Sequence, residues 1–96
     1  APVGNLYQNP QAFNEWVEQN IFHQDVILFG ETAECCLLQT ASELYFRGFN
    51  VYYIYEATDP MNERLEYKDN ILYHSTTSIY VKTIRYKEFL NLMGGN

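Results

Sequence analysis

Two apolar segments joined by a helical one most constrain the fold of this chain. Residues 25–30 contain four consecutive apolar side chains before a glycine, and residues 50–57 are mostly β-branched and aromatic. Neither segment alternates cleanly, so both indicate strands of a parallel sheet, buried on both faces. Between them, apolar residues recur at three- and four-residue steps from Leu37 to Tyr45, which predicts a helix that ends at Gly48. Two strands and a helix in this order form a right-handed parallel crossover.

The other segments extend this alternation of helices and strands. Asn9-Pro10 and Asp59-Pro60 each match a helix cap followed by a first-turn proline, and they predict helices over about 10–20 and 61–74. The inward face of the second helix would consist of Leu65, the stem of Lys68, Ile71 and Leu72. The series is completed by a strand over 78–82 and a helix over 85–92. The sequence therefore predicts the α/β class, as a three-layer αβα, Rossmann-like parallel sheet of about three strands, covered on both faces.

Composition limits the size and the partners of the chain. With 47% hydrophobic and 17% aromatic content, residues 1–96 make one small domain with a single core. The net charge of -6 and the presence of six Lys and Arg residues argue against a nucleic-acid-binding face. Residues 1–46 contain acidic side chains and no Lys or Arg. This asymmetry indicates either a solvated acidic surface or a face that meets a basic partner.

The cysteines and the first residues bear on the cellular compartment. Cys35 and Cys36 are the two cysteines of the chain and are adjacent, unlike the spread framework of a small secreted domain. A reducing, cytoplasmic compartment is therefore expected. No apolar run reaches the roughly 18 residues of a membrane helix, and no leader pattern follows Ala1. Because the chain does not begin with Met, we expect a processed or truncated product.

Cys36 is the strongest candidate for chemistry. Ligands of parallel α/β sheets lie beyond the carboxyl ends of the strands, and residues 30–36 follow the first predicted strand. Cys36 would lie at or near the first turn of the next helix, where backbone amides and the helix dipole favour a thiolate. From position alone, the alternative is a small side chain buried in the core.

Several features of residues 30–49 occur together at a fixed spacing. Gly30 lies six positions before Cys36, Thr40-Ala41 begins four positions after it, and Arg47-Gly48-Phe49 leads into the next strand. With these features the segment resembles the nucleophile segment of isochorismatase-like cysteine hydrolases. That superfamily includes nicotinamidases and related amidases. The resemblance implies a hydrolase that attacks a small amide through a cysteine.

The resemblance also implies the parts of the catalytic site. Its register selects Cys36 as the nucleophile and places Cys35 where the family has an ordinary apolar residue, which packs. The backbone amides of Cys36 and Thr32 would form an oxyanion hole, with a cis peptide bond at Glu31-Thr32. The likeness continues more weakly over about residues 10–92.

Two catalytic groups of the family have no counterpart in this sequence. Active members use an Asp near the end of their first strand and a Lys after a later strand, both in the amino-terminal half of a longer chain. The residues before Phe13 are too few to form that half, and Lys68, Lys82 and Lys87 lie in other elements. The metal ligands of nicotinamidases belong to the same half. We therefore expect no cofactor in this chain, and a divalent metal only if another half supplies its ligands.

Because these groups are missing, we interpret the chain as the carboxyl-terminal half of such a hydrolase. Without a general base and the lysine, this half would be inactive in isolation. Its expected partners are the amino-terminal half, as a second chain or a cleaved segment, and a small-molecule substrate, within an oligomer. Nucleic acid and membrane are not expected partners. Without the other half, residues 26–30 would form an exposed strand edge.

Two other classes of function remain open. The first is a noncatalytic protein-interaction module that retains the half-fold, in which Cys36 is incidental. The second is a redox switch through Cys35 and Cys36, which is weaker because a bridge between adjacent cysteines closes a strained ring.

Histidines and tyrosines have structural interpretations. His23 and His74 stand far apart in the sequence with no second ligand at metal spacing, so surface or capping roles are expected. The tyrosines of the second strand are expected to make core and helix contacts rather than a stacking platform; they are Tyr52, Tyr53 and Tyr55.

Three glutamates lie near predicted strand ends. Glu56 follows the second strand and is expected to have a structural role. Glu31 and Glu34 flank the turn before Cys36, where they would either discourage an anionic substrate or simply be exposed to solvent.

Overall fold

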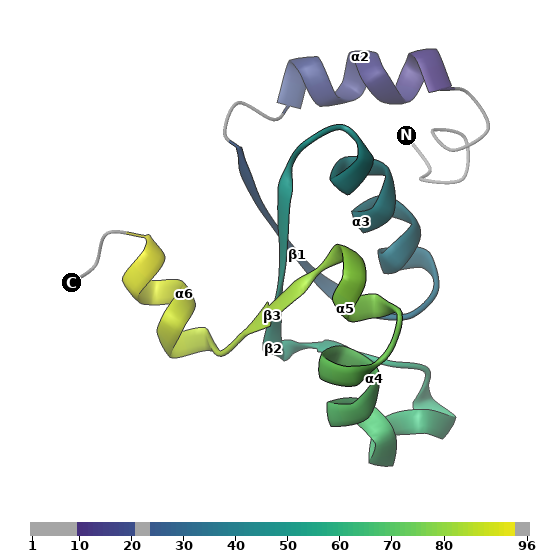
Figure 1. Cartoon of the computed structure of the whole chain (residues 1–96), viewed down its shortest axis with the longest axis vertical. Coiled ribbons are helices and arrows are strands. Elements are labelled where there is room, and N and C mark those ends of the chain that lie inside the picture. Colours follow the sequence, from purple (N-terminus) through teal and green to yellow (C-terminus); the bar gives the residue numbers. More distant parts are fainter. Residues whose placement is uncertain (1–9, 21–23, 94–96) are drawn as a thin grey trace.

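The computed structural model describes residues 10–20 and 24–93. Its elements in chain order are α2 (Pro10–Asn20), β1 (Asp25–Glu31), α3 (Cys36–Phe46), β2 (Asn50–Asp59), the 3-10 helix η1 (Asn62–Tyr67), α4 (Lys68–His74), α5 (Thr77–Tyr80), β3 (Lys82–Ile84) and α6 (Tyr86–Leu92). The strands form one parallel sheet in the order β1-β2-β3. The predicted α/β domain, a three-strand parallel sheet flanked by helices, is confirmed (Figure 1).

The main core lies between the sheet and α3. Successive side chains of a strand point to opposite faces, so Val51 and Tyr53 of β2 share one face. Both are buried there, with Ala41 and Leu44 of α3. The same core cluster also contains Phe13, Val17, Ala33, Leu72 and Val81. Apolar residues from α2, α3, α4 and β2, and from the segments after β1 and before β3, thus close this face, which we call the α3 face.

The opposite face carries α6, so we call it the α6 face (Figure 1). Ile54 and Ile84 are buried, at 5% and 1% exposure. Ile27 and Tyr52 are partly exposed and line an open groove of about 540 Å³ together with residues of α6. Phe29 of β1 is 63% exposed. The expectation that residues 25–30 are buried on both faces is therefore wrong, because α6 covers this side of β1 incompletely.

Among the described strands, β1 is an edge strand that pairs with β2 on one side. The register runs from Asp25 opposite Asn50 to Leu28 opposite Tyr53, then shifts before Gly30. Gly30 has a φ of +117°, a conformation that side-chain-bearing residues rarely adopt. The irregularity bends the end of β1 immediately before the turn that leads to Cys36.

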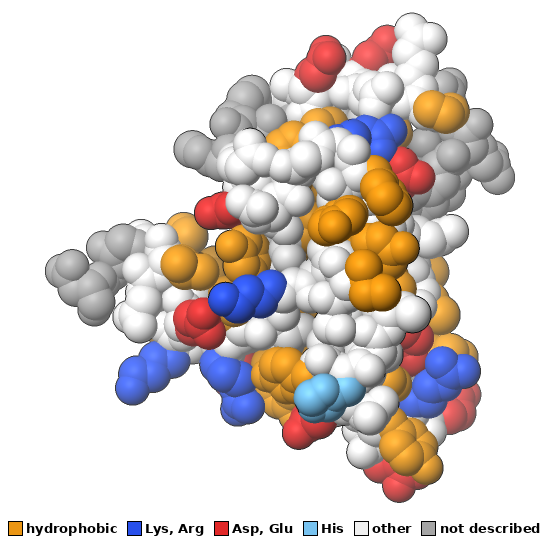
Figure 2. Space-filling view, viewed as in Figure 1, with side chains coloured by type: hydrophobic (Ala, Val, Ile, Leu, Met, Phe, Trp, Pro, Cys, Tyr) orange, Lys and Arg blue, Asp and Glu red, His pale blue; other side chains and the backbone are white. Residues whose placement is uncertain are grey.

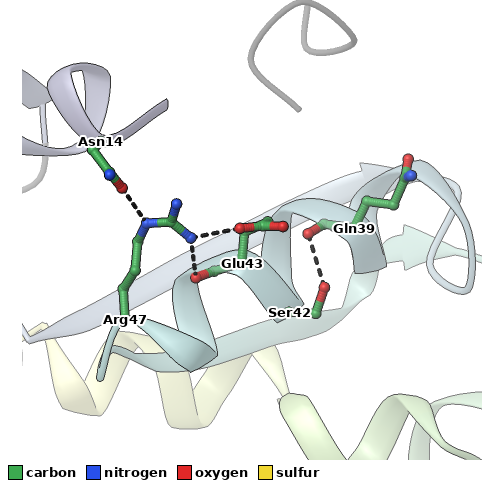
Figure 3. Close-up of polar contacts among 5 residues, drawn as sticks. All are labelled: Asn14, Gln39, Ser42, Glu43 and Arg47. Carbon is green, nitrogen blue, oxygen red and sulfur yellow. Dashed lines mark hydrogen bonds and ion pairs between the residues drawn. The ribbon is translucent and has the colours of Figure 1, made fainter. Parts of the chain in front are cut away.

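Arg47 connects α2 to the end of α3 (Figure 3). Its Nε donates to Oδ1 of Asn14 at 2.7 Å, and its Nη1 binds Glu43. The guanidinium also lies 4.5 Å from the ring centroid of Phe13, which in turn lies 6.2 Å from the ring of Trp16. These contacts explain how a short helix is held against the core. Pro10 is the first residue of α2, as predicted, whereas Asn9 lies outside the described residues.

The predicted helix over 61–74 is interrupted. Asp59 and Pro60 do not begin a helix; Asp59 ends β2, and the 3-10 helix η1 starts at Asn62. Arg64 has non-helical angles, and α4 begins at Lys68. The break turns Leu65 outward at 46% exposure, so its expected inward position is wrong. Elsewhere on this face Leu72 is buried, while Lys68 and Ile71 are partly buried, as expected.

The predicted strand over 78–82 is also wrong in its limits. Residues 77–80 form the helical turn α5, and β3 covers Lys82–Ile84. Ser75 explains the difference, because its hydroxyl accepts from the amide of Thr77 and its carbonyl accepts from the hydroxyl of Ser78. Such local bonds compete with pairing to a strand. None of the described helices has the length and apolar character needed to cross a bilayer.

Candidate active-site turn around Cys36

The turn that carries the cysteines joins β1 to α3. Cys36 is the first residue of α3, and Cys35 is its N-cap residue, so the predicted position of Cys36 is confirmed. Both thiols are exposed. The expectation that Cys35 packs in the core is therefore wrong, because the N-cap position points it away from the α3 face.

Backbone hydrogen bonds fix the shape of this turn. The carbonyl of Thr32 accepts from the amides of Cys35 and Leu37, each at 3.1 Å. The amide of Gln39 donates to the carbonyl of Cys35 and continues α3. The peptide bond between Glu31 and Thr32 is cis, as the resemblance implies. Thr32 and Cys36 are thus brought into one short turn, and the use of their amides as an oxyanion hole stays a prediction.

Two side chains anchor this turn to the rest of the domain through contacts that the sequence analysis did not predict. The hydroxyl of Tyr53, which is fully buried, donates to the carbonyl of Ala33 at 2.8 Å. A carboxylate oxygen of Glu34 accepts from the amide of Met61 at 3.0 Å, and Glu34 also pairs with Arg64 at 3.4 Å. Glu34 is therefore largely buried rather than free in solvent. The sequence signal that could have indicated the Tyr53 anchor is the presence of a tyrosine in a core strand, because a buried tyrosine hydroxyl needs a hydrogen-bond partner.

The cysteines open onto a surface groove of about 540 Å³. It runs along α3 to α5, and its lining comprises Glu34, Cys35, Cys36, Leu38, Gln39, Ser42, Phe46 and Tyr80. This lining, taken from the described residues, includes no Lys, Asp or His. Glu34 is the one carboxylate in this lining, and it is bound to the amide of Met61 and to Arg64. The Asp and Lys that the resemblance implies are thus not supplied at the groove by this part of the chain.

An aromatic cluster closes the far end of the groove. The rings of Tyr45, Phe46 and Tyr80 lie 5.3 to 5.7 Å apart with steep interplanar angles. Phe46 is 73% exposed, and Ile79 of α5 is 60% exposed. Figure 2 shows apolar side chains gathered on the surface over α3 and α5. The groove therefore offers an apolar end and a polar, thiol-bearing end.

Glu56 has the structural role that its position predicts. Its carboxylate accepts from Nε of Arg85 at 2.9 Å and from the amide of Tyr86 at 2.8 Å, and so binds the first turn of α6. Desolvation acts to raise the pKa of Glu56, but the hydrogen bonds from Arg85 and Tyr86 together outweigh it and lower the pKa. The anchor between β2 and α6 is thus ionic.

The lysines occupy positions other than the groove. Lys68 lies 3.0 Å from a carboxylate oxygen of Asp59 and 4.3 Å from the ring centroid of Tyr55. Tyr55 donates its hydroxyl to Asp69, and this hydrogen bond is the main cause of a raised pKa of Tyr55. Lys82 and Lys87 are exposed in β3 and α6.

Metal binding finds no support in the described residues. Over 10–20 and 24–93, no three His, Cys, Asp or Glu side chains are grouped to hold a metal ion. His74 is exposed, in agreement with a surface role, and its ring lies beside that of Tyr73. His23 lies outside the described residues.

No protein-family model, curated protein or solved structure matches this chain. The resemblance to isochorismatase-like hydrolases therefore stays a prediction that rests on the residues around Cys36.

Proposed function

We propose that this chain is the nucleophile-bearing half of a cysteine hydrolase of the isochorismatase-like type, which cleaves the C–N bond of a small neutral amide. The observation that supports this most is the place of Cys36. It is exposed, it is the first residue of a helix that directly follows a parallel strand, and it opens onto a groove. Helix starts of this kind favour the thiolate that nucleophilic attack requires.

In the proposed reaction, the thiolate of Cys36 attacks the amide carbonyl carbon. The carbonyl oxygen gains the negative charge and is bound by the backbone amides of Thr32 and Cys36, each contributing about 3 kcal/mol. The C–N bond then breaks, and the leaving nitrogen takes a proton. Water hydrolyses the resulting thioester and returns the thiol.

The proton transfers need groups from another half of the fold. We propose that this half supplies an Asp as general base and acid and a Lys near the carbonyl, and that it binds along the edge of β1. Ile27 and Phe29 support this arrangement, because an edge strand with exposed apolar side chains is a template for a further strand. The described residues do not fit a metal site, so a metal would need ligands from that other half. The thiol chemistry suits a reducing, cytoplasmic compartment.

Native mass spectrometry tests the split-chain proposal. We expect the purified complex to contain a second polypeptide of about 80 to 110 residues that carries the Asp and the Lys, as typical domain sizes indicate. The variant Phe29→Lys should abolish the association, because it places a charge on the proposed edge. A matched control, Ile79→Lys, changes a similarly exposed apolar residue of α5, which contacts β3 at the other end of the sheet, and should leave the complex intact. A chain that is found alone under all conditions contradicts the proposal.

Thiol alkylation tests the catalytic role separately. The variants Cys35→Ser and Cys36→Ser each leave one exposed thiol, which makes them matched controls for each other. We expect Cys36, in Cys35→Ser, to react with iodoacetamide at pH 7 at least about tenfold faster than Cys35 does in Cys36→Ser. Equal, slow rates would favour the noncatalytic interaction module instead.

A further inference from the structure

We infer that Tyr53 is a positioning residue for Cys36, because its buried hydroxyl holds the turn that presents the thiol. The inference rests on the proposed function, in which Cys36 is the nucleophile. It concerns a contact made by this chain's own second strand and not by the missing half.

The peptide groups of Ala33 are held on both sides. The carbonyl of Ala33 accepts from the hydroxyl of Tyr53 at 2.8 Å, and its amide donates to the carbonyl of Asp59 at 2.9 Å. Tyr53 and Asp59 both belong to β2, so one strand fixes the turn at two points. Ala33 and Tyr53 are each 0% exposed. Water is excluded from this hydrogen bond, so its loss would leave a buried carbonyl without its donor.

The fixed peptide is directly connected to the turn of Cys36. Ala33 follows Thr32, and the carbonyl of Thr32 accepts from the amides of Cys35 and Leu37, the two neighbours of Cys36. A shift of Ala33 therefore moves the acceptor that sets the first turn of α3. Misplacement by about 1 Å is enough to reduce catalytic rates by roughly two orders of magnitude. Tyr53 thus controls both the direction in which the thiol of Cys36 points and the positions of the backbone amides around it.

Glu34 provides a second anchor on the other side of the turn. Its carboxylate accepts from the amide of Met61 and pairs with Arg64, both in the segment after β2. The turn is thus held at two places: by the buried hydroxyl of Tyr53, and by the carboxylate of Glu34, which binds the segment after β2. Loss of either anchor should loosen the turn, with the buried anchor having the larger effect. Because Glu34 is also a negative charge in the groove of Cys36, its removal has an additional electrostatic effect that favours the thiolate.

The test is the alkylation of Cys36 by iodoacetamide in the Cys35→Ser background, at pH 7 and at pH 9.5. An ordinary thiol is mostly ionised at pH 9.5 but not at pH 7. The ratio of the rate at pH 7 to the rate at pH 9.5 therefore reports stabilisation of the thiolate separately from access of the reagent to the thiol. We expect Tyr53→Phe, which keeps the ring in the core, to lower this ratio by roughly fivefold or more. Tyr55→Phe is the matched control, since it removes a hydroxyl from the same strand away from the turn and should leave the ratio unchanged.

The outcomes separate this inference from the proposed function. An unreactive Cys36 in the parent protein would overturn the proposed function itself. A reactive Cys36 whose ratio is the same in Tyr53→Phe would overturn the positioning role and leave the function standing. If Tyr53→Phe does not fold, Glu34→Ala is compared with Glu34→Gln, which removes the same charge but keeps an oxygen that can accept from the amide of Met61. A lower ratio in Glu34→Ala than in Glu34→Gln supports anchoring of the turn, and equal ratios contradict it.

Discussion

The two faces of the sheet differ in how completely they are covered. On the α3 face, Ala41, Leu44 and Tyr53 are each 0% exposed. On the α6 face, Phe29 is 63% exposed and Leu92 is 59% exposed. The two faces are built from similarly apolar residues, so composition does not cause the difference. What differs is the number of helices and loops that reach each face.

The comparison separates what the chain can stabilise by itself from what it leaves open. The α3 face has a closed core and holds the turn of Cys36 through Tyr53. The α6 face and the edge of β1 retain apolar surface that a further element could bury. Under the proposed function, the half-fold would thus be stable around its nucleophile and incomplete where the other half joins.

The largest effect is expected for truncation on the closed face. Leu44→Ala removes a fully buried side chain, and should lower the free energy of unfolding by about 2 to 5 kcal/mol. The same truncation at Leu92, on the open face, should change it by less than about 0.5 kcal/mol. Urea unfolding of both variants measures the difference. Equal losses at the two positions would show that the α6 face is as tightly packed as the α3 face.

A smaller effect is expected at Thr58 in the buried part of β2. Its side chain is 0% exposed, and its hydroxyl has no hydrogen-bond partner among the described residues. Thr58→Val replaces this hydroxyl with a methyl group, and should leave the stability unchanged or raise it by up to about 1 kcal/mol. Thr58→Ser keeps the hydroxyl, removes the methyl group, and should lower the stability by about 1 kcal/mol. A clear loss in Thr58→Val would mean that the hydroxyl is in fact bonded.

The smallest effect concerns pH and the attachment of α6. The pKa of Glu56 is lowered in the folded chain, so the carboxylate stabilises the fold above its ordinary pKa. That contribution is lost as the pH falls through the lowered folded pKa. Glu56→Gln should therefore be less stable than the parent near neutral pH, and the difference should shrink in acid. Thermal melts of both proteins at pH 7 and below pH 4 test this. A difference that does not depend on pH would rule out the ionic anchor.

The sequence predicted the parts of the fold that depend on long apolar patterns. The strands over 25–30 and 50–57 and their parallel order follow from two continuous apolar runs, and the helix between them follows from apolar residues at three- and four-residue steps. The region from Asp59 to Val81 was predicted less well. There, Ser75 forms local hydrogen bonds and the backbone of Arg64 interrupts the helix, and these effects arise at single residues rather than from a period.

The candidate site shows the same division. The position of Cys36 at the start of α3 was predicted, because it depends on spacing along one strand and one helix. The anchors at Tyr53 and Glu34 were not predicted, since each joins residues at least 20 positions apart in the sequence. The exposure of Cys35 also depends on the direction of a single N-cap side chain. Contacts of this kind follow from the folded geometry.

Trp16 lies in α2 beside Phe13, which is buried in the core, so its fluorescence makes the docking of this helix visible. Trp16 is the single tryptophan of the chain, and its ring lies 6.2 Å from the ring of Phe13 and is 37% exposed. Its emission therefore reports the environment of α2, while the tyrosines within residues 24–93 report the sheet and the other helices. Separation of α2 from the core would shift the emission to longer wavelength without a change at the sheet. One spectrum can thus distinguish the loss of α2 from the unfolding of the domain.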